Sequence, residues 1–212
     1  MDDRGILVIL SGFSGSGKGT MVKRLLELYP DDYALSISAT TRNPRDGEAQ
    51  GREYFFKTRQ EFEELIESDG LLEYAEYVGN YYGTPKDYVL EKLSEGKNVI
   101  LEIEIQGALK VKEKYPDALL LFTAPPSADA LKERLIGRGT ESPEVIMARL
   151  ARAAKEADSC EAYDYLIVND VLDDAVNDIN AAVITEKNRI KYGIELIGNI
   201  KEDIVKFLKG EA

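Results

Sequence analysis

A glycine-rich segment near the N-terminus has the composition and spacing of a phosphate-binding loop. Gly12 to Lys18 reads Gly-Phe-Ser-Gly-Ser-Gly-Lys and matches the pattern G-x-x-x-x-G-K. It follows an apolar run at Ile6 to Leu10 and precedes a stretch with helical periodicity, which is the context the pattern requires. Backbone N–H groups of such a loop converge on phosphate oxygens, and the lysine adds a cation beside the outer phosphates. Tight strand-to-helix packing alone would explain the glycines but not the lysine.

The loop departs from the strict pattern directly after its lysine. Position 19 is glycine, and the hydroxyl that usually follows the lysine comes one residue later, at Thr20. Because a hydroxyl in this region contacts Mg²⁺, Thr20 and Ser16 are both candidates, and Thr20 is the predicted metal contact. The residues predicted to bind the phosphates of a nucleotide are Ser14, Gly15, Ser16, Gly17, Lys18, Gly19 and Thr20.

Two arginines further along the chain could form a second anion site. Arg42 and Arg45 lie three residues apart around Pro44, after a run of serines and threonines. Two guanidinium groups and a tyrosine hydroxyl can satisfy a terminal phosphate through charge-assisted hydrogen bonds. Taken alone, such a pair is more commonly part of a solvated surface.

The elements that must position these residues alternate along the chain. Largely apolar runs of strand length recur at Val99 to Ile103, Ala118 to Phe122 and Tyr165 to Val168, and helical patterns separate them. Continuous apolar runs are typical of strands buried on both faces, so the alternation predicts an α/β fold with a parallel sheet flanked by helices. From about residue 36 a polar segment rich in Gly, Arg, Glu and Tyr interrupts this rhythm, which indicates an inserted subdomain.

Composition limits the chemistry that the chain can perform. Its 212 residues include 27 Lys and Arg against 39 Asp and Glu, and the resulting net charge of −12 disfavours binding to a nucleic acid polymer. A single cysteine and the absence of histidine disfavour disulfides, zinc sites and histidine-dependent catalysis. The first apolar run is too short to cross a membrane or to serve as a signal sequence, so we expect a cytoplasmic protein. A catalyst of this composition must work by positioning and charge.

Longer motifs resemble one enzyme family closely. The segments Thr40-Thr-Arg-Asn-Pro-Arg-Asp-Gly-Glu48 and Gly79-Asn-Tyr-Tyr-Gly-Thr84, together with Glu73 and Ile105-Gln-Gly107, are similar to those of guanylate kinases, and the resemblance covers about residues 5 to 185. It implies a P-loop nucleoside monophosphate kinase that transfers the γ-phosphoryl group of ATP to GMP with Mg²⁺. The products would be ADP and GDP, within purine nucleotide metabolism and GMP recycling.

The family architecture divides the chain into four parts. It implies one domain in which a P-loop NTPase-type parallel sheet carries an inserted nucleoside monophosphate-binding subdomain and a lid. The expected limits are about 1–35, 89–136 and 155–185 for the core, 36–88 for the subdomain, 137–154 for the lid and 186–212 for a C-terminal helical extension.

The resemblance also implies which residues hold the acceptor. The GMP phosphate would be bound by Arg42, Arg45, Tyr54 and Tyr82, and the guanine would be surrounded by Ser38, Glu73, Thr84 and Glu104. Glu104 stands where the family usually has Asp, so its reach differs by one methylene group. Glu102, on the same face of the strand, could assist through Mg²⁺-bound water, although both carboxylates could be no more than an acidic strand end.

On the donor side, the resemblance points to arginines in and near the expected lid. Arg134, Arg138 and Arg149 match arginines that approach the transferring phosphoryl group, and Asn169 matches a residue beside the adenine. The predicted catalytic residues are Lys18, Arg42, Arg138 and Arg149. For the lid arginines the alternative is a solvated helix face. Arg152 has no such counterpart.

Two other functions fit parts of the same resemblance. Guanylate-kinase-like modules without enzymatic activity bind phosphorylated peptides, but they typically lose P-loop and lid residues that are present here. A kinase of another phosphorylated acceptor, such as a sugar bisphosphate, is disfavoured by Glu73 and by the segment from Gly79 to Thr84.

The C-terminal extension has an amphipathic helical pattern from Ile194 to Leu208. Such a pattern predicts a helix that packs on its own core, with a contact to a second subunit as the alternative. The sequence leaves open whether the protein is a monomer or a homo-oligomer.

Overall fold

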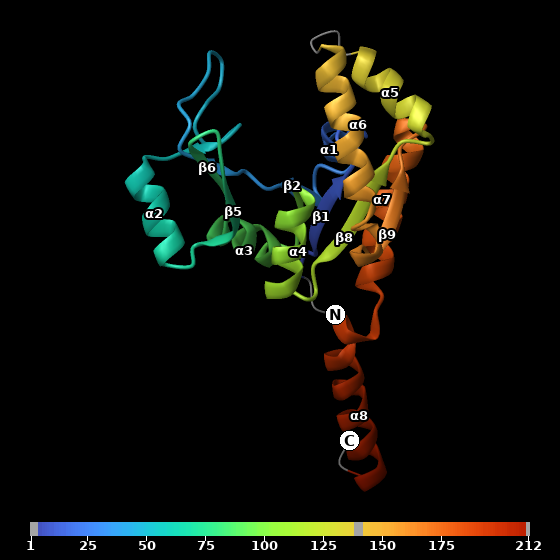
Figure 1. The fold of residues 1–212 in the computed structure, drawn as a ribbon. Helices are drawn as coiled ribbons and strands as arrows, with labels where there is room; N and C mark the ends of the chain where they lie inside the picture. Colours follow the sequence, from blue (N-terminus) through green and yellow to red (C-terminus); the bar gives the residue numbers. More distant parts are fainter. Residues whose placement is uncertain (1–3, 138–141, 211–212) are drawn as a thin grey trace.

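The computed structural model describes residues 4–137 and 142–210 and contains a five-stranded parallel sheet (Figure 1). The strand order is β2-β7-β1-β8-β9, and all four pairings are parallel. The strands are β1 (Leu7–Gly12), β2 (Tyr33–Leu35), β7 (Asn98–Glu102), β8 (Leu119–Ala124) and β9 (Tyr165–Val168). The predicted parallel α/β sheet is confirmed. The sequence did not predict β2, because three residues are too short to show a periodicity.

Helices cover both faces of this sheet, which explains why its strands are continuously apolar. Val8 and Leu10 of β1 face helices α1 (Lys18–Leu28) and α7 (Leu172–Lys187) in one buried cluster. Leu7 and Ile9 point to the opposite face, where α3 (Lys86–Ser94) and α4 (Ile105–Lys114) pack in a second cluster. Alternate residues of one strand therefore contribute to two cores, so none of them can be polar without loss of packing.

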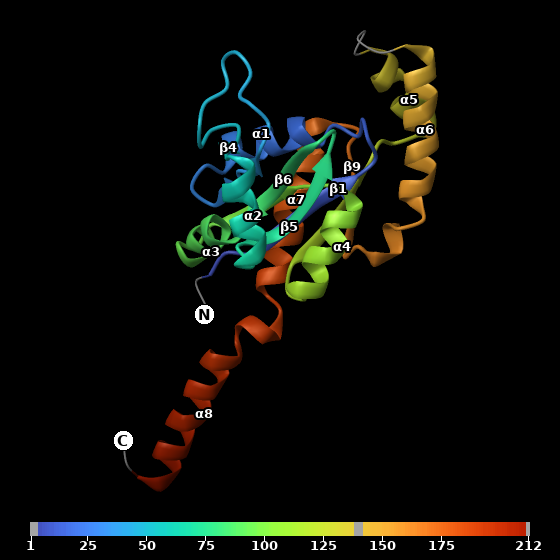
Figure 2. The same cartoon turned by 60° about the vertical axis from the view of Figure 1, so that its left-hand side comes forward.

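The inserted subdomain has a small sheet of its own in the order β4-β3-β6-β5 (Figures 1 and 2). Its elements are β3 (Ala39–Thr40), β4 (Phe55–Phe56), α2 (Arg59–Glu67), β5 (Leu71–Tyr77) and β6 (Asn80–Pro85). The capping box that begins α2 joins Thr58 and Glu61 in both directions. Buried Phe62 of α2 stacks on Tyr81 of β6, so the helix is held to the sheet by an aromatic contact.

Two helices follow β8 and form an arm beside the phosphate-binding loop (Figure 2). They are α5 (Ala128–Gly137) and α6 (Pro143–Ala157), and a short 3-10 helix, η1 (Cys160–Ala162), leads from α6 towards β9. Ser127 caps α5 by accepting a hydrogen bond from the N–H of Ala130. Leu131, Leu135 and Ala153 pack between the two helices and against Phe13, so this arm touches the loop directly.

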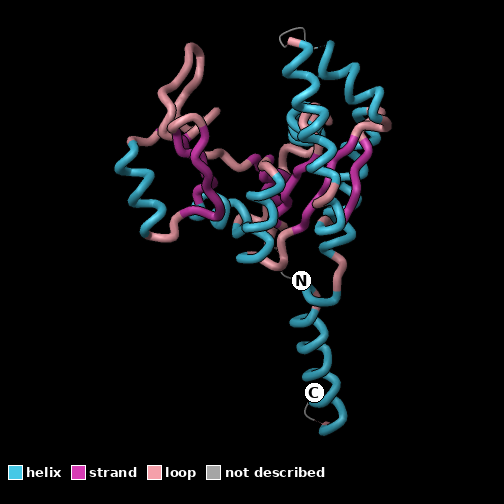
Figure 3. The backbone as a smooth tube through the Cα atoms, viewed as in Figure 1, coloured by secondary structure: helices cyan, strands magenta, loops and turns pink. Residues whose placement is uncertain are grey.

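The C-terminal helix does not pack on the core as the sequence predicted. Helix α8 (Ile194–Lys209) follows a short 3-10 helix, η2 (Ile190–Tyr192), and projects away from the domain (Figures 1 and 3). None of its residues is buried. Ion pairs from Lys191 to Asp117 and Glu186 fix η2 at the base of the core, and the chain leaves the core beyond that point. An amphipathic pattern shows that a helix has an apolar face but not which surface covers it.

No helix among the described residues has the length and apolar character needed to cross a membrane.

Candidate active site

The phosphate-binding loop connects β1 to α1 at the carboxyl edge of the parallel sheet. Gly12 has a φ of 131° and Gly17 a φ of 90°, values that side-chain-bearing residues rarely adopt. A Cβ atom at Gly12 would overlap the backbone of Thr123 on β8, and one at Gly17 would lie 2.5 Å from the side-chain nitrogen of Asn169. Both glycines are therefore required by conformation and by close contact, Gly12 with β8 and Gly17 with Asn169 just after β9.

Lys18 and the two candidate hydroxyls occupy distinct places in this loop. The ammonium of Lys18 donates to the carbonyl oxygens of Gly12 and Phe13, each at 3.0 Å, so it bridges the mouth of the loop.

The two candidate hydroxyls differ in burial. The hydroxyl of Ser16 is buried and lies 2.8 Å from that of Thr123. Thr20, in contrast, is exposed and lines the pocket beside the loop. Of the two candidate residues, Thr20 lines this pocket and Ser16 does not.

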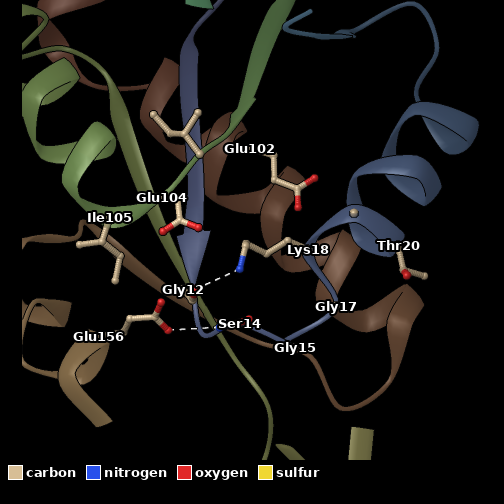
Figure 4. Close-up of a pocket in the computed structure, with 12 residues that line it drawn as sticks. Gly12, Ser14, Gly15, Gly17, Lys18, Thr20, Glu102, Glu104, Ile105 and Glu156 are labelled. Atoms are coloured by element: carbon tan, nitrogen blue, oxygen red, sulfur yellow. Dashed lines mark hydrogen bonds between the residues drawn. The ribbon is translucent and has the colours of Figure 1, made fainter. Parts of the chain in front are cut away.

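The pocket beside the loop has a volume of about 530 Å³ (Figure 4). Its walls are the loop itself, the end of β7, the start of α4 and the end of α6. The lining residues are Gly12, Ser14, Gly15, Gly17, Lys18, Gly19, Thr20, Glu102, Ile103, Glu104, Ile105 and Glu156. Backbone donors and one lysine thus face three carboxylates, a combination that suits a polyphosphate carrying a divalent cation.

Glu102 ends β7 close to the start of α1. Its carboxylate oxygens lie 3.6 and 3.8 Å from where a Cβ of Gly19 would be, so a larger residue at position 19 would contact it. Glu102 remains accessible to solvent at the pocket mouth, but the pocket walls partly desolvate its carboxylate and so raise its pKa. The positive charge of Lys18 opposes this rise. The glycine that broke the strict motif therefore leaves room for a carboxylate beside the lysine.

Arg134 and Asn169 lie behind the loop and hold its backbone. Both donate to the carbonyl oxygen of Ser16, Asn169 at 2.8 Å and Arg134 at 3.4 Å, and Arg134 also donates to the carbonyl oxygen of Asn169 at 2.7 Å. Asn169 is buried. These contacts fix the shape of the loop, a role that the sequence did not predict for either residue.

The second anion site is built on the inserted subdomain. Arg42 pairs with Glu48 at 2.9 Å, and its guanidinium lies over the ring of Tyr54, 5.3 Å from the centroid. Tyr82 of β6 lies edge-on to Tyr54, at 6.1 Å between ring centroids. The ion pair raises the pKa of Arg42 and lowers that of Glu48. Arg45 is exposed and contributes its backbone N–H to Glu48. The structure therefore brings Arg42, Tyr54 and Tyr82 together, with Arg45 at their rim.

Glu73 and Thr84 form a polar pair on adjacent strands of the same subdomain. The hydroxyl of Thr84, which is fully buried, donates to the carboxylate of Glu73 at 2.8 Å. The other carboxylate oxygen lies 3.2 Å from where a Cβ of Gly107 would be, so this glycine lets α4 approach. Burial raises the pKa of Glu73, while the Thr84 hydrogen bond and the charge of Lys110 oppose the rise.

Ser38, another residue predicted to surround guanine, is half-buried just before β3. Its carbonyl oxygen accepts a hydrogen bond from the backbone N–H of Phe55.

Glu104 is part of the pocket at the phosphate-binding loop, where it precedes α4. It forms an ion pair with Arg152 of α6, a residue to which the sequence gave no role. Arg152 also pairs with Glu156 on the same helix. The i,i+4 spacing of Arg152 and Glu156 was the available signal for this contact, but nothing in the sequence showed that the pair faces the loop.

Two arginines were predicted within the lid, Arg149 and Arg138. Arg149 is half-buried on α6. Arg138 lies outside the described residues.

A comparison with family models accounts for this set of sites. The model described as guanylate kinase matches residues 4–186. The chain belongs to the guanylate kinase family. A guanylate kinase from Clostridium perfringens (strain 13 / Type A) is 53% identical over 202 residues, which cover 95% of this chain and 93% of that protein. Another from Clostridium acetobutylicum is 47% identical over 211 residues, covering 100% of this chain and 97% of the relative.

A solved guanylate kinase has the same fold. The crystal structure of guanylate kinase from Anaplasma phagocytophilum superposes with a TM-score of 0.68 at 33% identity and covers 88% of each chain. The chain is a nucleoside monophosphate kinase of this family, an enzyme that phosphorylates GMP with ATP. The peptide-binding module and the kinase of another acceptor, which the sequence left as alternatives, are set aside by these relatives.

Proposed function

We propose that this guanylate kinase binds ATP with Mg²⁺ in the pocket at Gly12 to Lys18 and binds GMP on the inserted subdomain. The donor half rests on one observation above all, the loop with its lysine at the carboxyl edge of a parallel sheet. The acceptor half rests on the cluster of Arg42, Tyr54 and Tyr82, supported by Glu73 and Thr84. Each half binds one substrate, and phosphoryl transfer requires both substrates to be bound at once.

Phosphoryl transfer needs alignment and charge neutralisation more than covalent help, so a protein without histidine can catalyse it. Lys18 would neutralise the outer phosphates of ATP, and Arg42 would hold the phosphate of GMP in line with them. Arg149 and Arg138 would stabilise charge on the transferring group. Arg134 and Asn169 would act on the ATP side by keeping the loop in shape, because both hold the Ser16 carbonyl.

Magnesium would enter together with the phosphates of ATP. Among residues 4–137 and 142–210, no group of three or more His, Cys, Asp or Glu side chains could hold a metal ion. Thr20 is the favoured hydroxyl contact, since the hydroxyl of Ser16 faces Thr123. Glu102, beside Gly19, is placed to accept hydrogen bonds from water on the ion. The ion would supply electrostatic stabilisation of the transferring phosphoryl group.

Recognition of guanine would depend on the Glu73 carboxylate. Guanine presents N1–H and a 2-amino group side by side as donors, and an ionised carboxylate can accept both. Adenine has an acceptor at N1 and would be repelled. Thr84 orients Glu73 by its hydrogen bond, and Ser38 would contribute from the segment just before β3. Glu104 is a weaker candidate for the base than the sequence indicated, because it pairs with Arg152 at the phosphate-binding loop.

The division of labour implies a division of the chain. Residues about 1–35, 89–136 and 155–185 would be the core, 36–88 the GMP-binding subdomain, 137–154 the lid and 186–212 an extension. The proposed setting is the cytoplasm, without a nucleic acid polymer or a membrane as partner. The net charge of −12 supports the absence of these two partners, because it disfavours polyanions and anionic lipid surfaces alike.

The deciding experiment is a coupled assay of ADP release with ATP, Mg²⁺ and one of GMP, AMP, CMP or UMP. We expect ADP release with GMP and at most trace rates with the others. Equal rates with AMP would reject the proposed role of Glu73, and ADP release that does not depend on any acceptor would reject the two-site arrangement. We expect the rate of ADP release with GMP to be lost when Mg²⁺ is omitted.

A further inference from the structure

A carboxylate from the arm occupies a donor group of the phosphate-binding loop. The backbone N–H of Ser14 donates to Oε2 of Glu156 at 3.2 Å, although the two residues are 142 positions apart in the chain. Figure 4 shows Glu156 entering the pocket from α6, opposite Lys18. Its side chain is only 13% exposed. Glu156 is therefore held inside the pocket.

Arg152 keeps Glu156 in this position. Its Nε donates to Oε1 of Glu156 at 2.9 Å, one helical turn away, while the rest of its guanidinium pairs with Glu104. The two oxygens of Glu156 are thus shared between a backbone N–H of the loop and a guanidinium. The ion pair fixes the rotamer that points at Ser14.

We propose that Glu156 is an affinity-determining residue of the ATP site, a carboxylate that competes with nucleotide phosphate for the Ser14 N–H. This inference rests on the proposed donor pocket. An N–H that donates to a carboxylate has no second proton for a phosphate oxygen, so polyphosphate must displace Glu156 or accept one hydrogen bond fewer. Glu102 and Glu104 line the same pocket, and a third negative charge there adds repulsion towards the phosphates.

The consequence is a loop that holds ATP less tightly than its backbone alone would. Tight binding of both nucleotide substrate and product slows turnover when product release is limiting. A displaceable carboxylate lowers the affinity for any polyphosphate without altering the adenine or GMP contacts. Glu156 would therefore act on the phosphates of ATP and ADP and not on the acceptor.

The test is the Kd of Mg²⁺-ATP, measured by titration calorimetry on the full chain and on Glu156→Gln. The substitution keeps the volume of the side chain and its contact to Arg152 but removes the charge. We expect Kd for ATP to fall roughly three- to ten-fold, the size expected for loss of one charge-assisted hydrogen bond. Kd for inorganic tripolyphosphate should fall by the same factor, and Kd for GMP should stay within about two-fold of the parental value.

Two further variants separate contact from net charge and from folding. Glu161→Gln removes one exposed negative charge close by along the chain, on η1, and should leave Kd for ATP unchanged. Glu156→Asp keeps the charge but is one methylene too short for Ser14, so it should give a smaller tightening than Glu156→Gln.

The inference is overturned if Glu156→Gln binds ATP with unchanged or weaker affinity, since Glu156 would then be neutral or would support the loop. A loss of ATP binding with a lowered unfolding temperature counts in the same way. Equal tightening by Glu161→Gln would assign the effect to net charge and also overturn it. A parent chain that failed to bind ATP would instead reject the proposed donor pocket, so the two failures are distinguishable.

Discussion

The donor and acceptor halves of this enzyme are built from different materials. At the phosphate-binding loop the groups proposed to bind ATP are mostly backbone N–H groups, and the strand and helix that the loop connects are held by two buried helix-to-sheet clusters. On the inserted subdomain the groups are side chains, Arg42, Tyr54, Tyr82 and Glu73, on strands of two to seven residues and the loops beside them. The subdomain's own buried cluster consists of Ala39, Phe62 and Leu71, while Leu72 of β5 packs in the second cluster of the main core. A site made of backbone is fixed by the fold, whereas a site made of side chains depends on their mutual contacts.

The largest effect is expected from Lys18→Ala, which breaks the donor half. Because the lysine is proposed to neutralise the phosphates of ATP, kcat should fall by about 10³-fold or more. Kd for GMP should stay within about two-fold, since Lys18 lies at the phosphate-binding loop, where it donates to the carbonyl oxygens of Gly12 and Phe13, and not on the inserted subdomain. Steady-state rates and GMP titrations on the same preparation measure both quantities, and parental turnover in this variant would remove Lys18 from the mechanism.

Glu73→Gln tests the acceptor half at the guanine. The substitution replaces one acceptor by a donor facing the donors of the base, so kcat/KM for GMP should fall by roughly 10²- to 10⁴-fold. Thr84 can still donate to the remaining oxygen, and the unfolding temperature should change little. Kd for ATP serves as the internal control. Retained GMP activity would transfer the base contact to Ser38 or Glu104.

Arg42→Lys tests how far the acceptor phosphate depends on a planar guanidinium. Lysine keeps the charge but cannot pair with Glu48 and a phosphate in a fork geometry, and it stacks less well on Tyr54. We expect kcat/KM for GMP to fall by about 10- to 100-fold, measured under the conditions used for Glu73→Gln. If lysine supports parental activity, the phosphate is held by Arg45, Tyr54 and Tyr82 without Arg42.

A smaller effect is expected from pH, and it should distinguish the two halves. Burial raises the pKa of Glu73, so this carboxylate takes up a proton at a higher pH than an ordinary glutamate. The proposed base contact needs the ionised form, so GMP affinity should weaken as pH falls through the raised pKa. Calorimetry of GMP between pH 7 and about pH 5 measures this, with Glu73→Gln as the control. Identical pH profiles in parent and variant would contradict it.

The smallest effect is expected from removing residues 194–212. Helix α8 has no buried residue, so its loss should leave kcat unchanged and shift the unfolding temperature by less than about 2 °C. Differential scanning calorimetry and the coupled assay check this. A large destabilisation would mean that the apolar face of α8 is covered in solution.

The same contrast explains what could be predicted from sequence. Local patterns predict the structure of Ile6 to Leu10 and of the phosphate-binding loop. A continuous apolar run and a spaced glycine-lysine motif are each compatible with few structures. The small sheet of the subdomain was missed because Ala39–Thr40 and Phe55–Phe56 pair only through contacts distant in sequence. Arg42 and Arg45 were candidates from their residue types and spacing, and the other site residues of the subdomain were named through the family motifs.

Contacts between distant elements were the least predictable part of the site. The pairing of Arg152 with Glu104 and the bond from Ser14 to Glu156 join the loop, α4 and α6, and no local pattern marks them. Asn169 and Arg134 were predicted on the ATP side, but their hold on the Ser16 carbonyl depends on how β9 and α5 pass behind the loop.

Helix α8 has a consequence for the exchange of backbone hydrogens. An isolated helix of 16 residues is marginal in water, and Gly198 in its interior weakens it further. If solvent alone surrounds it, its amide hydrogens should exchange with deuterium almost as fast as those of an unstructured peptide. Those of β1, buried between two layers of helices, should persist until the domain opens. Protection of the α8 amides from exchange at levels approaching those of β1 would thus show that the isoleucines of α8 are covered by a protein surface.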